Sequence, residues 1–239
     1  MGFVLTDKTI RVDPHKLRAA SCWPKPTTQK EALSFIQFIS YNRKFVEDFA
    51  KHARPIYDCC NQPEFQWNDE CDKSFHHLKA VICSDPSLRL LDAHRHAWVF
   101  CDWSAISASW TILQRSSSCG RRGDWYAVLH GSKAMTKTQG ASWGSNKGEI
   151  FTLCHSLKQC REFLNSCLAT GANFSCFSDH KSLLGITTQK EISAYQLRML
   201  AAISELGNFP IYHRPGTNKQ LSIVDRLSRT KLDELPTCS

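Results

Sequence analysis

Four acidic side chains are spaced so that each would come from a different secondary-structure element: Asp102, Glu149, Asp179 and Asp225. The intervals between them are 47, 30 and 46 residues. Carboxylate oxygens from several elements are the ligands with which proteins hold two Mg²⁺ ions about 4 Å apart, with positions left open for phosphate and water. In such a centre one ion activates a water molecule and the other stabilises the leaving 3′ oxygen of a phosphodiester.

Each of these acids also has a simpler interpretation. A helix N-cap or a solvated surface charge is the better explanation of any single one, particularly of Glu149 and Asp225, since acids favour helix N-termini. Asp102 is harder to explain in this way, because it interrupts the mainly apolar run "AWVFCDWSAISASWTILQ" of residues 97–114. A charge buried in a core strand is costly unless it is paired, hydrogen-bonded or bound to a metal. Spacing by itself leaves both interpretations open.

The elements that must position these acids begin at about residue 95. Three strands are expected first, followed by alternating helices and strands, which is typical of a mixed sheet covered by helices. This pattern places Asp102 on the first strand, Glu149 in the first turns of a helix and Asp179 at the carboxyl end of the fourth strand. Asp225 falls near the start of a last helical segment. The expected strands are 97–102, 107–114, 124–131, 173–178 and 209–213, and the expected helices are 146–164, 179–186, 193–206 and a segment around 222–229.

The first 90 residues read as a short β segment followed by helices. Asp13 is expected to cap a helix that has Pro14 at its first position. Thr28 and Glu31 form a capping box before the next helix, and a third helix follows Asn68. The apolar stripe of that third helix consists of Cys71, Phe75, Leu78 and Ile82.

Composition narrows the function classes. The 239 residues include 30 Lys and Arg against 22 Asp and Glu, a net charge of +8 that favours a polyanionic partner without requiring one. The 12 cysteines show no Cys-x-x-Cys pair, and several lie in amphipathic patterns, which indicates reduced, buried thiols rather than disulfides or a zinc site. We see no secretory signal and no apolar run of 18 residues, so we expect an intracellular protein of cytoplasm or nucleus that does not contact a membrane.

The motifs, taken in order, resemble the C-terminal part of the reverse transcriptase in the Pol polyprotein of gypsy-type LTR retrotransposons. The segments "GFVLTDKTIRVDPHKL", "WPKPTTQKEALSFIQFISYNRKFVEDFA", "FQWNDECDKSFHHLK" and "DPSLRLLD" are similar to those that join polymerase to nuclease. The segments "CDWSAISASWTILQ", "WGSNKGEIFTL", "FSDHKSLL" and "YHRPGTNKQLSIVDRLSR" are similar to the four acid-bearing blocks of the ribonuclease H domain. Together they span nearly the whole chain, from Gly2 to Arg229.

This resemblance implies an α/β fold in which a mainly helical thumb and connection region precedes an RNase H-like five-stranded mixed sheet with flanking helices. It divides the chain into the end of the palm with the helical region (1–92), the RNase H-like domain (93–230) and a tail (231–239). The four acids fall on the metal-binding positions of the family, which take two Mg²⁺ ions, with Mn²⁺ as a substitute. His213 falls where cellular ribonucleases H carry a histidine for proton transfer or product release, although a phosphate-contacting or solvated histidine is an equal alternative.

The implied activity is hydrolysis of the RNA strand of an RNA/DNA hybrid, with the rest of a Pol polyprotein as a further partner. Lys181 and Arg214 are candidate phosphate contacts, and Arg43, Lys44 and Lys51 are candidates for tracking the hybrid backbone; a surface cation is otherwise simply solvated. The chain carries no Tyr-x-Asp-Asp motif, so we expect it not to polymerise DNA by itself.

Several departures from the family pattern leave a second function open. Ser107 and Ser109 stand where the family usually has glycines, which could crowd the backbone beside Asp102. Lys147 replaces an acid of the Glu149 block, and the loop after "RPG" is longer than usual, which brings the placement of His213 into question. The alternative is a non-catalytic module for nucleic-acid binding or assembly, a retroelement remnant whose acids are vestigial.

Overall fold

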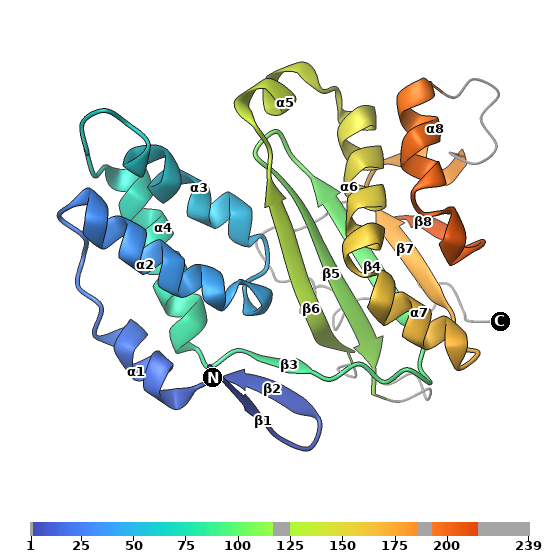
Figure 1. Ribbon diagram of the computed structural model, residues 1–239, viewed down its shortest axis with the longest axis horizontal. Coiled ribbons are helices and arrows are strands. Elements are labelled where there is room, and N and C mark those ends of the chain that lie inside the picture. The colour runs from blue at the N-terminus through green and yellow to red at the C-terminus, as the bar shows by residue number, and fades with distance from the viewer. Residues whose placement is uncertain (1, 117–124, 186–192, 215–239) are drawn as a thin grey trace.

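The computed structural model describes residues 2–116, 125–185 and 193–214. Asp225, the helical segment expected around 222–229 and the tail 231–239 lie outside these residues. In Figure 1 a group of four helices with a small three-stranded sheet lies beside a larger five-stranded sheet. The first group consists of β1 (Phe3–Leu5), β2 (Thr9–Val12), α1 (Pro14–Ser21), α2 (Gln29–Tyr41), the 3₁₀ turn η1 (Arg43–Phe45), α3 (Phe49–Cys60), α4 (Asp69–Cys83) and β3 (Ser87–Arg89).

Local capping explains where these helices begin. The Asp13 side chain accepts a hydrogen bond from the main chain of the first turn of α1, and Thr28 with Glu31 forms the expected capping box of α2. Asn68 caps α4 as expected. All four residues of the expected α4 stripe are buried in the core of the helical group. Two elements were not predicted from the sequence: α3, which carries Pro55 within it, and β3, which pairs with β2.

The larger sheet has the strand order β6-β5-β4-β7-β8. The strand β5 is antiparallel to both of its neighbours, β6 and β4, whereas β7 is parallel to β4, and β8 is parallel to β7. This arrangement confirms the expected five-stranded mixed sheet. The strands are β4 (Ala97–Trp103), β5 (Ser107–Arg115), β6 (Trp125–Ala134), β7 (Phe174–Ser178) and β8 (Ile211–His213).

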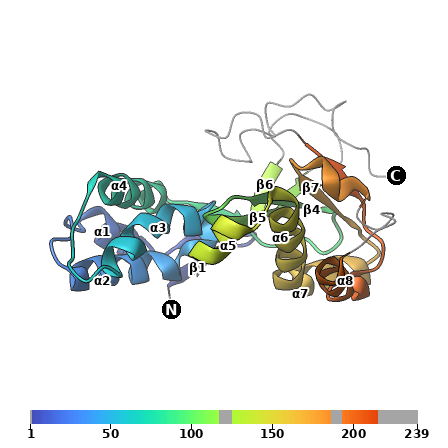
Figure 2. The same ribbon diagram turned by 90° about the horizontal axis from the view of Figure 1, so that it is seen from above.

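Helices α6, α7 and α8 lie together on one side of the sheet (Figure 2). The single helix expected over 146–164 is in fact two, because the chain breaks at Cys160 between α6 and α7. The short α5 was not expected, and the helix expected over 193–206 ends early and is followed by a 3₁₀ turn. These elements are α5 (Lys137–Ser142), α6 (Ser145–Gln159), α7 (Arg161–Ala169), the turn η2 (Lys181–Gly185), α8 (Ala194–Ala201) and the turn η3 (Ser204–Leu206).

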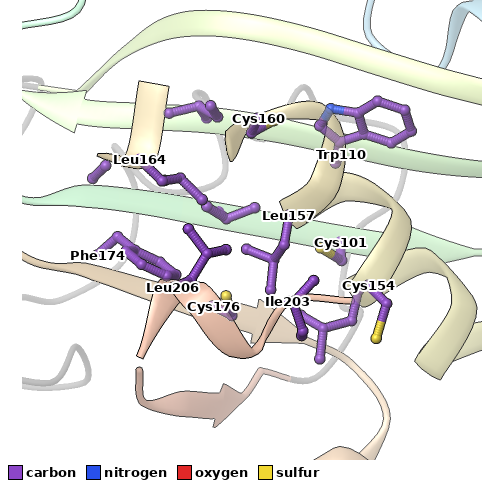
Figure 3. Close-up of a cluster of buried hydrophobic side chains, with 14 of the residues drawn as sticks. Cys101, Trp110, Cys154, Leu157, Cys160, Leu164, Phe174, Cys176, Ile203 and Leu206 are labelled. Atoms are coloured by element: carbon purple, nitrogen blue, oxygen red, sulfur yellow. The ribbon is translucent and has the colours of Figure 1, made fainter. Parts of the chain in front are cut away.

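The main core lies between the sheet and these helices and contains several cysteines (Figure 3). The ten described cysteines are all free thiols; eight of them are buried, whereas Cys22 and Cys83 are exposed. Burial raises the pKa of Cys154 and of Cys160 to about 12, so both thiols stay protonated and pack as small apolar groups. Among the described helices, none is both long and apolar enough to cross a membrane.

The helical group contacts the large sheet along its edge strand β6. The main-chain N–H of Ala50, in the first turn of α3, donates a hydrogen bond of 2.9 Å to Ser132 Oγ on β6. Arg54 Nη1 donates a bond of 2.8 Å to the Met135 carbonyl oxygen just after that strand. Because α3 supplies both bonds, its N-terminal half fixes the helical group against the carboxyl end of β6.

Candidate active site at the carboxyl ends of β4 and β7

Asp102 and Asp179 lie at the same end of two adjacent parallel strands. Phe100 of β4 is the register partner of Phe177 of β7, and their rings stack with centroids 4.6 Å apart and an interplanar angle of 8°. Each aspartate follows its phenylalanine by two residues. Because the last register pair of these strands is Phe100 with Phe177, both aspartates lie just beyond it, at the same end of the sheet. The carboxyl ends of parallel strands are where open α/β sheets form their sites.

Glu149 approaches the same strand ends from α6. Its side chain is 2% exposed, and its Oε2 accepts a hydrogen bond of 3.0 Å from Ser178 Oγ, the residue before Asp179. The preceding Gly148 faces the indole ring of Trp103, the residue after Asp102; a Cβ atom there would lie 2.1 Å from Trp103 Cε2. The first turns of α6 therefore approach β4 closely and bring a buried carboxylate to the strand ends.

The turn after β7 is held by one main-chain and one side-chain hydrogen bond from the end of β8 and the residue after it. Arg214 N donates 2.8 Å to the Ser178 carbonyl oxygen, and His213 Nε2 lies 3.1 Å from the Asp179 carbonyl oxygen. Because a carbonyl oxygen only accepts, Nε2 of His213 carries the proton of this bond, and Nδ1 is the ring nitrogen that could take up another. Lys181 begins η2 two residues after Asp179 and is exposed.

The serines that replace the family's glycines fit into the sheet. Ser109 is the register partner of Asp102, and its Oγ donates a hydrogen bond of 3.4 Å to the Asp102 carbonyl oxygen. Ser107 closes the turn between β4 and β5, where Ser104 N donates 2.8 Å to the Ser107 carbonyl oxygen. The β4–β5 ladder is regular from Trp98 to Trp103, so these side chains do not interrupt the strand that carries Asp102.

The cations expected to follow the hybrid backbone lie apart from the acids, in the helical group. Arg43 is exposed in η1, and Lys51 is exposed in α3. Lys44 already has aromatic partners, because its Nζ lies 3.7 Å from the centre of the Phe3 ring, and burial lowers its pKa. The structure thus brings Asp102, Glu149, Asp179, His213, Arg214 and Lys181 to one end of the sheet and keeps Arg43 and Lys44 outside that group.

The donor set at this end of the sheet is made of carboxylate oxygens, which suit a hard divalent cation such as Mg²⁺. Within the described ranges, however, no three Asp, Glu, His or Cys side chains are grouped closely enough to hold a metal ion. Asp225, the fourth expected ligand, lies outside those ranges. The metal assignment of the four acids therefore remains a prediction.

Ser178, which is 4% exposed and hydrogen-bonded to Glu149, was not predicted from the sequence. The sequence does indicate such a residue, because Ser178 places a hydroxyl at an inward-facing position of a buried strand, directly before an aspartate. The bond also shows that Glu149 is not the solvated surface acid of the simpler interpretation, since its carboxylate is buried and accepts a hydrogen bond.

The chain is similar in sequence to reverse-transcriptase proteins of retroelements. Residues 67–170 match the model of an RNase H-like domain found in reverse transcriptase. The match crosses residue 92, so the expected division into domains stays a prediction. The chain is 27% identical to the retrovirus-related Pol polyprotein from transposon 412 of Drosophila melanogaster over 98% of its own length, and 26% identical to that from transposon opus over 99%. It spans 18% and 24% of these two polyproteins, respectively.

A solved structure shares the fold over the full length of the chain. The foamy viral protease-reverse transcriptase in complex with an RNA/DNA hybrid superimposes with a TM-score of 0.63 at 17% identity, covering 100% of this chain and 31% of that one. At this level of identity the likeness concerns the fold alone. The fold confirms the expected order of a helical region followed by an RNase H-like sheet.

Proposed function

From its similarity to retrotransposon Pol polyproteins and its match to an RNase H-like domain of reverse transcriptase, we propose a function for this chain. The domain built on the five-stranded sheet is a metal-dependent ribonuclease that acts on RNA/DNA hybrids. The observation that supports the proposal is that Asp102 and Asp179 stand at the same end of the parallel strands β4 and β7, while Glu149 accepts a hydrogen bond from Ser178, the residue before Asp179. These acids come from three elements that are far apart in the sequence.

The proposed reaction is hydrolysis of an RNA phosphodiester. Water adds to phosphorus, the bond to the 3′ oxygen breaks, and the products carry a 3′-OH and a 5′-phosphate. Asp102, Glu149, Asp179 and Asp225 would hold two Mg²⁺ ions, or Mn²⁺ in their place, which supply an activated water and charge stabilisation of the leaving oxygen. The protein's own contribution is to orient the carboxylates at the sheet edge.

We assign proton transfer or phosphate contact beside Asp179 to His213. Its Nε2–H is held by the Asp179 carbonyl oxygen, which leaves Nδ1 as the nitrogen that accepts a proton or contacts a phosphate. Lys181 and Arg214 flank the same turn and supply positive charge for the scissile strand. We assign backbone tracking at a distance to Arg43 rather than Lys44, because the Lys44 ammonium already lies over an aromatic ring.

The substrate we propose is an RNA/DNA hybrid, recognised through 2′-OH groups on one strand and phosphates on both. The net charge of +8 favours such a polyanion. The related foamy viral enzyme was solved with an RNA/DNA hybrid, which supports this choice of substrate. We further propose that the rest of a Pol polyprotein is the natural partner, since the related polyproteins extend well beyond the matched part.

The test compares the wild-type chain with Asp179→Asn and Glu149→Gln. We expect Mg²⁺-dependent cleavage of a labelled hybrid to fall by at least about 100-fold in both variants, while hybrid binding in EDTA stays within about twofold, because the isosteric amides remove charge but little volume. Arg161→Ala is a matched control, since Arg161 pairs with Glu205 on the surface and does not contact the sheet edge. Cleavage by Asp179→Asn at the wild-type rate would refute the site.

The second function is a non-catalytic binding or assembly module, and it rests on the departures from the family pattern at Ser107, Ser109 and Lys147. A Mg²⁺ or Mn²⁺ titration by calorimetry, with the cleavage assay beside it, separates the two functions. Metal binding with cleavage supports the nuclease. Hybrid binding without metal binding at millimolar concentrations supports the module.

A further inference from the structure

Ser178 links two acids of the proposed metal site. Its Oγ donates to Glu149 Oε2 at 3.0 Å and accepts from the main-chain N–H of His180 at 3.1 Å. An ionised carboxylate can only accept and an amide N–H can only donate, so the direction of both bonds is fixed. A continuous chain of hydrogen bonds therefore runs from the turn that contains Asp179, through one hydroxyl, to the carboxylate supplied by α6.

This link lies in a buried environment. Ser178 is 4% exposed and Glu149 is 2% exposed, so solvent does not replace the hydroxyl if it is lost. A buried hydrogen bond to a charged group is stronger than one in water, so the loss of this donor alters how the carboxylate is held. Ser178, which carries no charge itself, therefore contributes to the orientation of Glu149.

We propose that Ser178 is a positioning residue, which orients the Glu149 carboxylate toward the Asp179 turn and so prepares the site to bind its divalent cations. The proposal rests on the nuclease function proposed above. Hydrogen-bonding partners of metal ligands typically contribute tenfold to 100-fold in metal affinity. The turn itself does not depend on the hydroxyl alone, because Arg214 N donates to the Ser178 carbonyl oxygen and His213 Nε2 to that of Asp179.

The chain offers a matched control on the same strand. Ser175 of β7 is also 4% exposed, and its Oγ lies 2.8 Å from His96 Nε2, away from the acids. Replacing Ser175 by alanine removes a buried hydroxyl and a side-chain hydrogen bond of similar length. A general loss of packing or stability in β7 would therefore appear in both alanine variants, whereas a loss of metal affinity would appear only at Ser178.

The experiment measures Mn²⁺ binding to the full chain without nucleic acid, through the loss of the electron paramagnetic resonance signal of free Mn²⁺. We expect Ser178→Ala to weaken binding by about tenfold and Ser175→Ala to leave it within about twofold. The pair Ser178→Thr and Ser178→Val adds a comparison at constant shape. Threonine keeps the hydroxyl and should bind as the wild type does, whereas valine should bind as weakly as alanine.

The outcomes separate the two proposals. Equal Mn²⁺ affinity in the threonine and valine variants, with wild-type binding intact, would overturn the role of Ser178 and leave the nuclease proposal standing. Absence of both Mn²⁺ binding and hybrid cleavage in the wild type would overturn the nuclease proposal, and the role of Ser178 with it. A cleavage defect of Ser178→Val that excess Mn²⁺ reverses, with hybrid affinity in EDTA unchanged, would support the positioning role.

Discussion

Gly148 of α6 lies directly against the indole ring of Trp103 at the end of β4, so closely that a Cβ atom on Gly148 would be 2.1 Å from Trp103 Cε2. Asp102 precedes Trp103, and Glu149 follows Gly148. The absence of a side chain at one helical position therefore sets how closely two acids of the candidate site can approach. This close contact is a requirement of the site as well as of the core.

We predict that Gly148→Ala destabilises the protein by about 1–3 kcal/mol, because the added methyl group must displace an aromatic ring or shift α6. This loss opposes the gain of about 1 kcal/mol that alanine normally brings to a helix interior. Urea unfolding followed by tryptophan fluorescence measures the net effect, and hybrid cleavage should fall as Glu149 moves away from Asp102. Gly144→Ser is the control: a Cβ atom there meets nothing within 4 Å, and serine is a favourable N-cap for α6. A variant Gly148→Ala as stable as the wild type would contradict the close packing.

Arg54 connects α3 to the large sheet, and its loss should weaken that junction. Its Nε pairs with Asp58 at 2.8 Å, while Nη1 donates to the Met135 carbonyl oxygen at 2.8 Å. We expect Arg54→Ala to lower the free energy of unfolding by about 1–3 kcal/mol, since a half-buried carbonyl loses a charged donor. The exposed pair of Arg161 and Glu205 should contribute at most about 1 kcal/mol, so Arg161→Ala is the comparison. Equal losses in the two variants, measured by urea unfolding, would show that the junction adds nothing beyond a surface ion pair.

Acid should destabilise the protein through histidines that are neutral in the folded state. Burial lowers the pKa of His130 from the ordinary 6.5 to about 4, against an opposing effect of Asp48, and His130 Nδ1 lies 2.9 Å from Thr111 Oγ1. The unfolded chain therefore takes up a proton before the folded chain does. The stability contributed by the neutral ring is complete above about pH 6.5 and is lost progressively as the pH falls to about 4.

Acid should also weaken the contact between α3 and α4, where His52 and His77 stack with ring centroids 3.9 Å apart. Burial lowers the pKa of both histidines, that of His52 to about 4. At His52 the nearby His77 and Lys51 lower the pKa further, whereas Asp48 raises it. We predict that Tm falls between pH 7 and pH 5 and that His130→Gln reduces this fall, whereas His94→Gln, at an exposed position, does not. An unchanged pH dependence of Tm in His130→Gln, measured by differential scanning calorimetry, would contradict the assignment.

Local signals in the sequence predicted much of the fold. Asp13, Thr28 and Asn68 cap their helices because a short polar side chain satisfies free N–H groups wherever the following residues can form a turn. The mainly apolar run of residues 97–114, with turn residues in its middle, predicted two of the central strands for the same reason: it depends only on neighbouring residues. The helix α3 was not predicted, because Pro55 lies within it. The strand β3 was not predicted either, because a strand of three residues is defined by its pairing with β2.

The candidate site also has a part that could be predicted from the sequence and a part that could not. The types and spacing of Asp102, Glu149 and Asp179 were readable in the sequence, because carboxylates on separate elements are a chemical pattern. What only the tertiary structure decided is their relation to one another: the parallel register of β4 with β7, the close approach of Gly148 to Trp103, and the bond from Ser178 to Glu149. These are contacts between residues far apart in the chain, and packing and strand pairing determine them, not local propensity.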